Sequence, residues 1–331
     1  MNLLALLLLL SMYANLSAKL IVGDLEFNQI NAAEIKSSFR MLTDTAEVTI
    51  PRRFQVEGRL VDDLNSVFSK GDPCQIWLGY NDDLRLEFTG YLDYYEPKPA
   101  ITLHFQDEMF NLKTTPIRQA FHQVKLADLL AAVAPGYKVQ CPEISLGNME
   151  IKDLSPAGVL KKLEEDFSLF SYFKSWETDK VLYSGFAYDN RFNTELLHLQ
   201  KNVKDARNLN YQVREASDFK VTAISHQKDG SKIKVSLPKD AKGDAETRTL
   251  NFGPMTKAEL EAMATGELIR FNYSGYRGDL KLFGQPVLHH GDSVTIEDAA
   301  YGRKSSNLVD ETTTRFGAIY LERTIKLGPQ V

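Results

Sequence analysis

Three strand-like runs between positions 71 and 106 constrain the fold of this chain most strongly. The run at 84–89 places leucine or phenylalanine at every second position, which is the period of a strand with one buried face. The run at 101–106 alternates in the same way, and an apolar run at 75–80 precedes the polar Asn81-Asp82-Asp83 tip. Three strands within about 35 residues, joined by short turns, predict an antiparallel barrel or sandwich.

More strands are expected on the N-terminal side of this segment. A hairpin is predicted over residues 19–27 around Gly23-Asp24, and strands are predicted at 35–40 and 46–50. Together with the first three runs, these strands predict that residues 19–116 form one all-β domain of about seven short strands.

The periodicity changes at residue 117 and predicts an α+β insert over residues 117–205. One helix is expected at 126–133, and a longer one starts at Ser155, with Pro156 in the first turn and an apolar stripe along one face. Short strands complete the expected insert: 137–141, 171–174 and 181–185.

After residue 208 the pattern returns to β. Thr256 and Glu259 have the spacing of a capping box and predict a helix that reaches Arg270. Residues 206–331 are therefore expected to be a second small β-barrel with a helix-containing insertion around 255–275. The expected strands are 211–213, 219–225, 232–237, 276–283, 293–296 and 319–327.

The N-terminus is rich in leucine over residues 3–10, a stretch too short to span a bilayer. Residues 1–18 are interpreted either as a leader or as a mis-called N-terminal extension. A signal peptide would have this apolar core, but no basic residue precedes it. Translation that starts at Met12 is the other reading. Neither reading predicts a stable membrane anchor.

Composition limits the classes of partner. The 331 residues carry a formal net charge of −5, which argues against sequence-specific nucleic-acid binding through a basic surface. Cys74 and Cys141 are far apart and lack metal-ligand spacing, so two reduced thiols are favoured over one disulfide.

The most metal-like cluster is His289-His290 with Asp292. Adjacent histidines on a strand point to opposite faces, and Gly291 marks a turn, so a structural turn is favoured over a ligand set. The acidic run Glu164-Glu165-Asp166 suggests paired carboxylates, but lysines beside it favour a solvated helix face.

The remaining candidates also favour structural interpretations. His104 and His122 stand alone, and Cys74 has no histidine near it in the sequence. The aromatic residues between 77 and 95 suggest either a sugar-binding platform or, by preference, core: Trp77, Tyr80, Phe88, Tyr91, Tyr94 and Tyr95. We therefore predict no catalytic, cofactor-binding or metal-binding residues, no cofactors and no enzymatic activity.

Three stretches resemble phage tail baseplate-hub proteins of the late-control-gene-D type. They are 36–54, which includes SSFRMLTDTAEVTIPRRF, then 71–116, which includes GDPCQIWLGY and DEMFNLKTTP, and 255–327. The hub part of type VI secretion spike proteins is similar.

The resemblance implies a mainly β fold of two β-barrel tube domains with an α+β insert. It further implies a structural homotrimer, a pseudo-sixfold ring that adapts the tail tube to the central spike, contacts baseplate wedge proteins and lets DNA or effector pass. The expected location is the virion tail baseplate, assembled in the bacterial host cytoplasm. Phage, prophage and injection device are not distinguished.

Two alternatives stay open at this point. A real leader would export the chain, and the alternative function is then a secreted β-rich carbohydrate- or protein-binding protein. A secreted hydrolase is a third class, supported only by the carboxylate and histidine clusters above. A hub is expected to be trimeric and to lack a leader, whereas a secreted binder is expected to be processed near Ala18.

Overall fold

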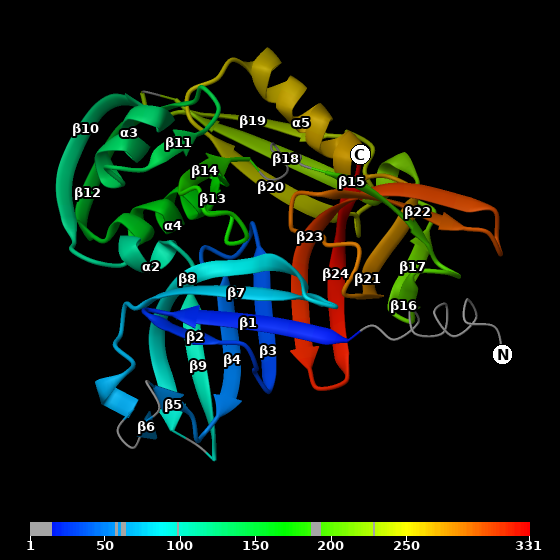
Figure 1. Ribbon diagram of the computed structural model, residues 1–331. Coiled ribbons are helices and arrows are strands. Elements are labelled where there is room, and N and C mark those ends of the chain that lie inside the picture. Colours follow the sequence, from blue (N-terminus) through cyan, green and yellow to red (C-terminus); the bar gives the residue numbers. More distant parts are fainter. Residues whose placement is uncertain (1–14, 57–58, 61–63, 98, 187–192, 228) are drawn as a thin grey trace.

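The computed structural model describes residues 15–56, 59–60, 64–97, 99–186, 193–227 and 229–331. The protein is mainly β, with several sheets and short helices, as the sequence predicts (Figure 1). None of the helices in these ranges is long and apolar enough to cross a membrane. The predicted leucine-rich segment at 3–10 lies outside the described residues.

The first part of the chain folds into a strongly curved sheet with strand order β3-β4-β9-β8-β7-β1-β2 (Figure 1). Inward side chains at alternate positions form its core, which includes Leu20, Ile76 and Phe105. The elements are β1 (Leu16–Val22), β2 (Leu25–Phe27), β3 (Ala32–Ser38), β4 (Thr45–Pro51), β5 (Gln55–Val56), β6 (Arg59–Leu60), the 3-10 turn η1 (Leu64–Ser66), β7 (Pro73–Tyr80), β8 (Asp83–Pro97) and β9 (Ala100–Gln106).

Two tight turns in this sheet follow directly from the sequence. β1 and β2 pair around Gly23-Asp24, as predicted, and Gly23 has a φ of 55°. Asn81 and Asp82 have φ values of 52° and 62° and join β7 to β8. This left-handed pair of residues is the two-residue hairpin geometry that Asn and Asp tolerate best.

The predicted boundary after residue 18 needs a correction. β1 begins at Leu16, and residues 16–18 pair with residues 78–80 of β7. Ala18 is buried with Leu20 and Val22, because the inward alternation of the strand starts before Lys19. Cleavage near Ala18 would therefore remove three of the seven residues of β1.

The insert packs three helices against two small sheets. Helix α4 begins at Ser155 as predicted: its hydroxyl accepts a hydrogen bond of 3.1 Å from the Gly158 N–H. The elements are α2 (Met109–Leu112), β10 (Ile117–Lys125), α3 (Leu126–Val133), β11 (Lys138–Gln140), β12 (Ser145–Leu154), α4 (Pro156–Phe167), β13 (Phe170–Tyr172) and β14 (Val181–Gly185).

The sequence analysis missed the long β10–β12 pair of the insert. β10 exposes most of its side chains, so it lacks the alternation of a half-buried strand. Backbone pairing with β12 holds it in place, and only the fold brings these two segments together.

The C-terminal part adds strands to the first sheet and also contains a separate layer. Its elements are β15 (Thr194–His198), β16 (Val203–Asp205), β17 (Leu209–Gln212), the 3-10 turn η2 (Ala216–Asp218), β18 (Phe219–His226), β19 (Lys232–Leu237), β20 (Glu246–Phe252), α5 (Lys257–Phe271), β21 (Gly275–Phe283), β22 (Ser293–Asp298), β23 (Arg303–Gly317) and β24 (Tyr320–Gln330).

The predicted insertion at 255–275 is wider than expected. β18, β19 and β20 form their own three-stranded sheet, and α5 packs on it to form a small core (Figure 1). The Thr256 and Glu259 capping box of α5 is present as predicted. The strand over 246–252 was missed, because its sequence is mostly polar.

One strand that was not predicted, β23, joins the two parts of the chain. It pairs with β24 and β22 and also with β3, where Gly317 is opposite Ala32. The two β units expected as separate barrels are consequently one continuous sheet of 14 strands. β15 and β16 pair with β22 and β21, so residues 194–205 belong to this sheet and not to the insert.

Candidate functional site: the junction of the sheet and the insert

Two buried carboxylates tie the first sheet to the insert. Thr45 of β4 is opposite Gln106 of β9, so Asp44 and Asp107, one position beyond, are neighbours at the end of this strand pair. The Asp44 N–H donates to the Asp107 carboxylate at 3.0 Å, and the Asp107 N–H donates to the Asp44 carbonyl at 3.1 Å.

The Asp44 carboxylate also reaches across to the insert. It accepts hydrogen bonds from the Ser37 hydroxyl at 2.6 Å and from the Ser175 hydroxyl at 2.8 Å. Ser175 belongs to the loop between β13 and β14. Burial raises the pKa of Asp44 to about 7, and it raises the pKa of Asp107 well above its ordinary value, with the nearby Asp44 charge adding to the effect.

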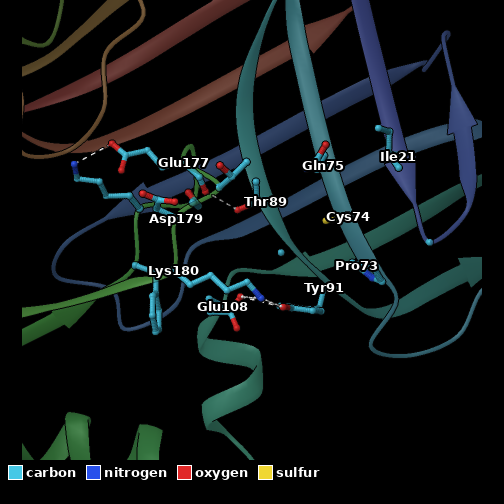
Figure 2. A pocket seen from close by; sticks show the side chains of 16 residues that line it. Ile21, Pro73, Cys74, Gln75, Thr89, Tyr91, Glu108, Glu177, Asp179 and Lys180 are labelled. Carbon is cyan, nitrogen blue, oxygen red and sulfur yellow. Dashed lines mark hydrogen bonds and ion pairs between the residues drawn. The ribbon is translucent and has the colours of Figure 1, made fainter. Parts of the chain in front are cut away.

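A pocket of about 320 Å³ lies where this loop meets the first sheet (Figure 2). The Thr89 N–H donates to the Ser175 carbonyl at 2.5 Å, so β8 and the loop are connected through their backbones. The lining is mixed in polarity and includes Ile21, Cys74, Tyr91, Glu108, Glu177 and Lys180.

The Glu108 carboxylate is the central acceptor of the polar network at one side of this pocket (Figure 2). Its Oε2 accepts from the Tyr91 hydroxyl at 3.0 Å and from Lys180 Nζ at 2.9 Å. Its Oε1 accepts from the Tyr137 hydroxyl at 2.6 Å and from Asn111 Nδ2 at 2.8 Å. These four donors come from both the sheet and the insert, so the carboxylate connects the two by hydrogen bonds.

A cluster of aromatic and histidine rings closes the junction on the C-terminal side. The Trp176 and His289 rings stack with centroids 4.1 Å apart and an interplanar angle of 1°. His290 is fully buried, lies edge-on to Trp176 and Tyr172, and neither ring nitrogen has a hydrogen-bond partner in the described part of the chain. Burial lowers the pKa of His290 to about 3, and it lowers the pKa of His289 as well.

A buried ion pair fastens the N-terminal and C-terminal strands together. Arg323 of β24 donates two hydrogen bonds to the Glu87 carboxylate of β8, at 2.8 and 2.9 Å. The two side chains are only 1% and 3% exposed. Glu87 points inward because a bulge in β8, opposite Ile76 and Trp77, shifts the alternation at this position.

The histidine–aspartate cluster and the acidic run considered in the sequence as possible sites form hydrogen bonds and ion pairs that hold local structure. Asp292 does not ligate with the histidines: it accepts hydrogen bonds from the His289 and Asn193 N–H groups at 2.8 and 3.0 Å. Lys161 pairs with Glu164, and Lys162 with Asp166, on the solvated side of α4. Within the described ranges no group of three or more metal-ligating side chains converges.

The other single candidates are dispersed over the molecule. His104 stacks on Tyr94 on the outer side of the sheet, with ring centroids 4.2 Å apart, and His122 is exposed on β10. Cys74 is buried beside the pocket, where burial raises its thiol pKa, and both cysteines are free.

The preference for a core role is right for three of the six aromatic residues: Phe88 belongs to the core of the first sheet, and Tyr80 and Tyr95 pack against it. Phe88 is fully buried, but Trp77 is half-buried on the outer side of β7 and Tyr94 is 51% exposed. Cys74, Ile76 and Leu78 are the inward residues of β7, so the phase assumed for Trp77 was shifted by one residue.

Sequence analysis did not single out the residues that hold the junction: Glu87, Asp107, Glu108, Trp176 and Arg323. Two of the sequence motifs that carry the family resemblance contain residues of this junction. The motif LTDT includes Asp44, and the motif DEM includes Asp107 and Glu108. Their proximity to each other and to Ser175 depends on strand register and on the position of the insert.

Comparison with known proteins is informative at the level of structure. No family model matches the chain, and no curated protein matches it by sequence. A tail protein from Neisseria meningitidis matches with a TM-score of 0.67 and 14% identity, over 95% of this chain and 96% of that chain. A 43 kDa tail protein of a Shewanella oneidensis prophage matches with a TM-score of 0.63 and 16% identity, over 94% and 97%.

A third match extends the comparison to secretion machinery. It is an Escherichia coli component of the type VI secretion system, with a TM-score of 0.58 and 10% identity, over 95% of this chain and 77% of that chain. Each of the three matches covers nearly all of this chain, including its insert and both β units. The chain therefore has the fold of these tail proteins, and the tail-protein resemblance seen in its sequence is confirmed at the level of the fold.

Proposed function

We propose that this chain is the structural hub of the baseplate of a phage-like contractile tail or injection device. Its copies form a homotrimeric ring, and the two β units of each copy give that ring a pseudo-sixfold character. The ring adapts the tail tube to the central spike, contacts the baseplate wedge and lets DNA or effector pass. The protein works in the virion tail baseplate after assembly in the host cytoplasm.

The observation that supports this proposal most strongly is the continuous sheet. β23 pairs with β3 over seven residue pairs, so the N-terminal and C-terminal β units share one hydrogen-bonded surface. A ring that carries mechanical load through repeated β units needs such units to be fixed relative to one another. The match to tail proteins over nearly the whole chain supports the same role.

The junction chemistry fits a structural role better than a catalytic one. The Glu108 carboxylate is occupied by four donors, and the Glu87 carboxylate by Arg323. Both groups are used to hold elements together, and both are surrounded by side chains from distant parts of the sequence. We propose that the chain has no enzymatic activity of its own.

The test is the mass of the assembly in solution. Light scattering after size exclusion is measured on the full chain, alone and with the tube and spike proteins from the same genome. We expect the chain alone to form a particle of about three times its 37.4 kDa mass, and a heavier particle when the tube and spike proteins bind. A tube protein from an unrelated tail is the matched control and should not bind.

Two results would contradict the proposal. One is a monomer or dimer that stays unchanged with both partners at every concentration measured. The other is recovery of the chain outside the cell, trimmed within its N-terminal 18 residues, which would favour the secreted binding protein. Intact mass spectrometry of the protein from its native host separates starts at Met1, at Met12 and near Ala18.

A further inference from the structure

A groove of about 510 Å³ follows the outer edge of β20. β20 is the last strand of its sheet, and in the described part of the chain it pairs only with β18. Five consecutive residues of β20, 246–250, line the groove. Because successive side chains of a strand point to opposite faces, a hollow that touches all five lies along the edge of the strand.

The opposite wall of the groove comes from other parts of the chain. It includes Phe170 of the insert, Phe271 at the end of α5, Tyr273 just after that helix, and residues 327–329 of β24. A second hollow of about 230 Å³ continues past Arg248 toward Phe252, between the insert and α5. Five strand residues span about 17 Å at 3.3 Å per residue, so the groove has the length of a short extended peptide.

Arg277 gives the groove a cation that forms no ion pair with a carboxylate of the described residues, although the Glu246 charge lies near it. Its guanidinium donates to the Phe271 and Tyr273 carbonyls at 2.9 and 3.2 Å and lies 4.2 Å from the centroid of the Tyr273 ring. Its Nε is buried and has no hydrogen-bond partner among the described residues. The ion pairs of these residues do not include Arg277.

The neighbouring arginines differ from Arg277 in this respect. Arg40 pairs with Asp310 at 3.0 Å, and Arg248 pairs with Glu267 at 2.8 Å. Burial and the nearby Arg214 charge lower the pKa of Arg277, and the Tyr273 and Glu246 charges offset only part of that lowering. A carboxylate in the groove would favour the charged form of the Arg277 guanidinium and pair with it.

We propose that this groove binds an extended peptide segment of a partner protein, which adds a strand to β20 and places a carboxylate on Arg277. The backbone groups of β20 on the side away from β18 supply hydrogen bonds at strand spacing, and the aromatic wall receives alternate side chains. A nucleic acid would satisfy Arg277 but not the strand edge, and the net charge of −5 disfavours it. The inference does not depend on the role in a tail.

The experiment uses the full chain and a fluorescent peptide of alternating valine and threonine that ends in two glutamates. Fluorescence anisotropy is expected to show saturable binding. Methylation of every second peptide amide should weaken it at least tenfold, because strand addition needs those N–H groups. Replacement of both glutamates by glutamine, with an amidated C-terminus, should also weaken it at least tenfold.

Two outcomes of the peptide series overturn the proposal. If the methylated peptide binds as tightly as the parent, or the parent does not bind at millimolar concentration, strand addition to β20 is wrong. If an oligothymidine of equal charge binds as tightly as the parent peptide, the groove recognises nucleic acid and not an extended peptide.

Protein variants test the assignment of Arg277. Arg277→Gln should weaken binding of the parent peptide at least tenfold, whereas Arg277→Lys should keep part of it. Arg118→Gln is the matched control, since Arg118 is an exposed arginine on β10 paired with Asp153. Unchanged binding by a folded Arg277→Gln protein overturns the assignment.

Hydrogen exchange of the wild-type protein provides a readout that does not depend on the folding of a variant. The amides of residues 246–252 should gain protection when the peptide is added. Protection confined to other strands overturns the proposed docking mode.

Discussion

At the scale of single residues, buried titratable groups define how the junction responds to pH. Asp44 accepts three hydrogen bonds, from the Ser37 and Ser175 hydroxyls and from the Ser38 N–H, and it is completely buried. Burial without a cationic partner favours the protonated acid, which explains the direction of its pKa. His290 shows the opposite case, since burial favours its neutral ring.

The raised pKa of Asp44 predicts a stability that falls with rising pH. The folded state holds the proton up to about pH 7, whereas an unfolded aspartate releases it near 4, so the stabilisation is present below about pH 4 and is lost between pH 4 and 7. Asp44→Asn should flatten this fall, by up to about 1.4 kcal/mol per pKa unit. Urea unfolding at pH 4.5, 6 and 8 measures it.

The comparison with a matched variant reports on Asp44 together with Asp107, whose raised pKa depends in part on the Asp44 charge. His290 contributes in the opposite direction, because its stabilisation is lost as pH falls from about 6.5 toward 3. The difference between wild type and Asp44→Asn removes that common contribution. Asp240→Asn, at an exposed site, should leave the profile unchanged, and an equal effect of both substitutions would contradict the interpretation.

At the scale of elements, strand phase decides which side chains stabilise the sheet. β7 and β8 were both predicted, but the inward face of β7 carries Cys74, Ile76 and Leu78 and not Trp77. On β8 the bulge places Glu87 and Phe88, two consecutive residues, in the interior. Simple alternation predicts the existence of these strands and fails at the bulge.

The phase of these strands predicts unequal effects of two aromatic truncations. Phe88→Ala should lower the free energy of unfolding by about 3–5 kcal/mol, since the ring is fully buried in the sheet core. Trp77→Ala, on the outer face, should cost roughly 1 kcal/mol. Denaturant unfolding of both variants under one condition tests the order, and a larger cost for Trp77→Ala would refute it.

At the scale of the whole molecule, contacts between residues far apart in the sequence join the N-terminal and C-terminal β units. β3 and β23 are nearly 300 positions apart and pair directly. Glu87 and Arg323 are separated by 236 positions and form the buried ion pair beside that seam. Arg323 also donates to the Leu288 carbonyl and the Thr314 hydroxyl through Nη1, so its two terminal nitrogens are hydrogen-bonded, while its buried Nε has no partner among the described residues.

This ion pair predicts strong coupling between the two ends of the chain. Arg323→Met should destabilise the protein by about 3–5 kcal/mol, because it leaves the Glu87 carboxylate buried and uncompensated. The double variant Glu87→Leu/Arg323→Met should recover most of that loss, since no buried charge remains. Denaturant unfolding of the single and double variants forms the cycle, and simple additivity would contradict the coupling.

Local patterns in the sequence were sufficient for several elements. The hairpin at Gly23-Asp24, the Ser155 cap of α4 and the capping box of α5 depend on residues close together in the chain, and the structure contains each of them. The mainly β class follows from the alternating runs for the same reason. A period of two is the direct consequence of strand geometry.

The missed strands have a common cause. β10, β20 and β23 are rich in polar or charged residues, and each is held by backbone pairing with a strand that the fold brings to it. In β23, buried Thr312 and Thr314 occupy inward positions that the sequence pattern alone would assign to solvent.

The sequence by itself determined the strands with one apolar face, the helix caps and the tight turns, because neighbouring residues supply all the interactions that define them. Only the tertiary structure decided three features: the pairing of β3 with β23, the inward orientation of the Glu87 side chain, and the proximity of Asp44, Asp107 and Ser175. These features depend on register and on charge pairing across hundreds of positions. A buried polar group is stable only when its distant partner is in place.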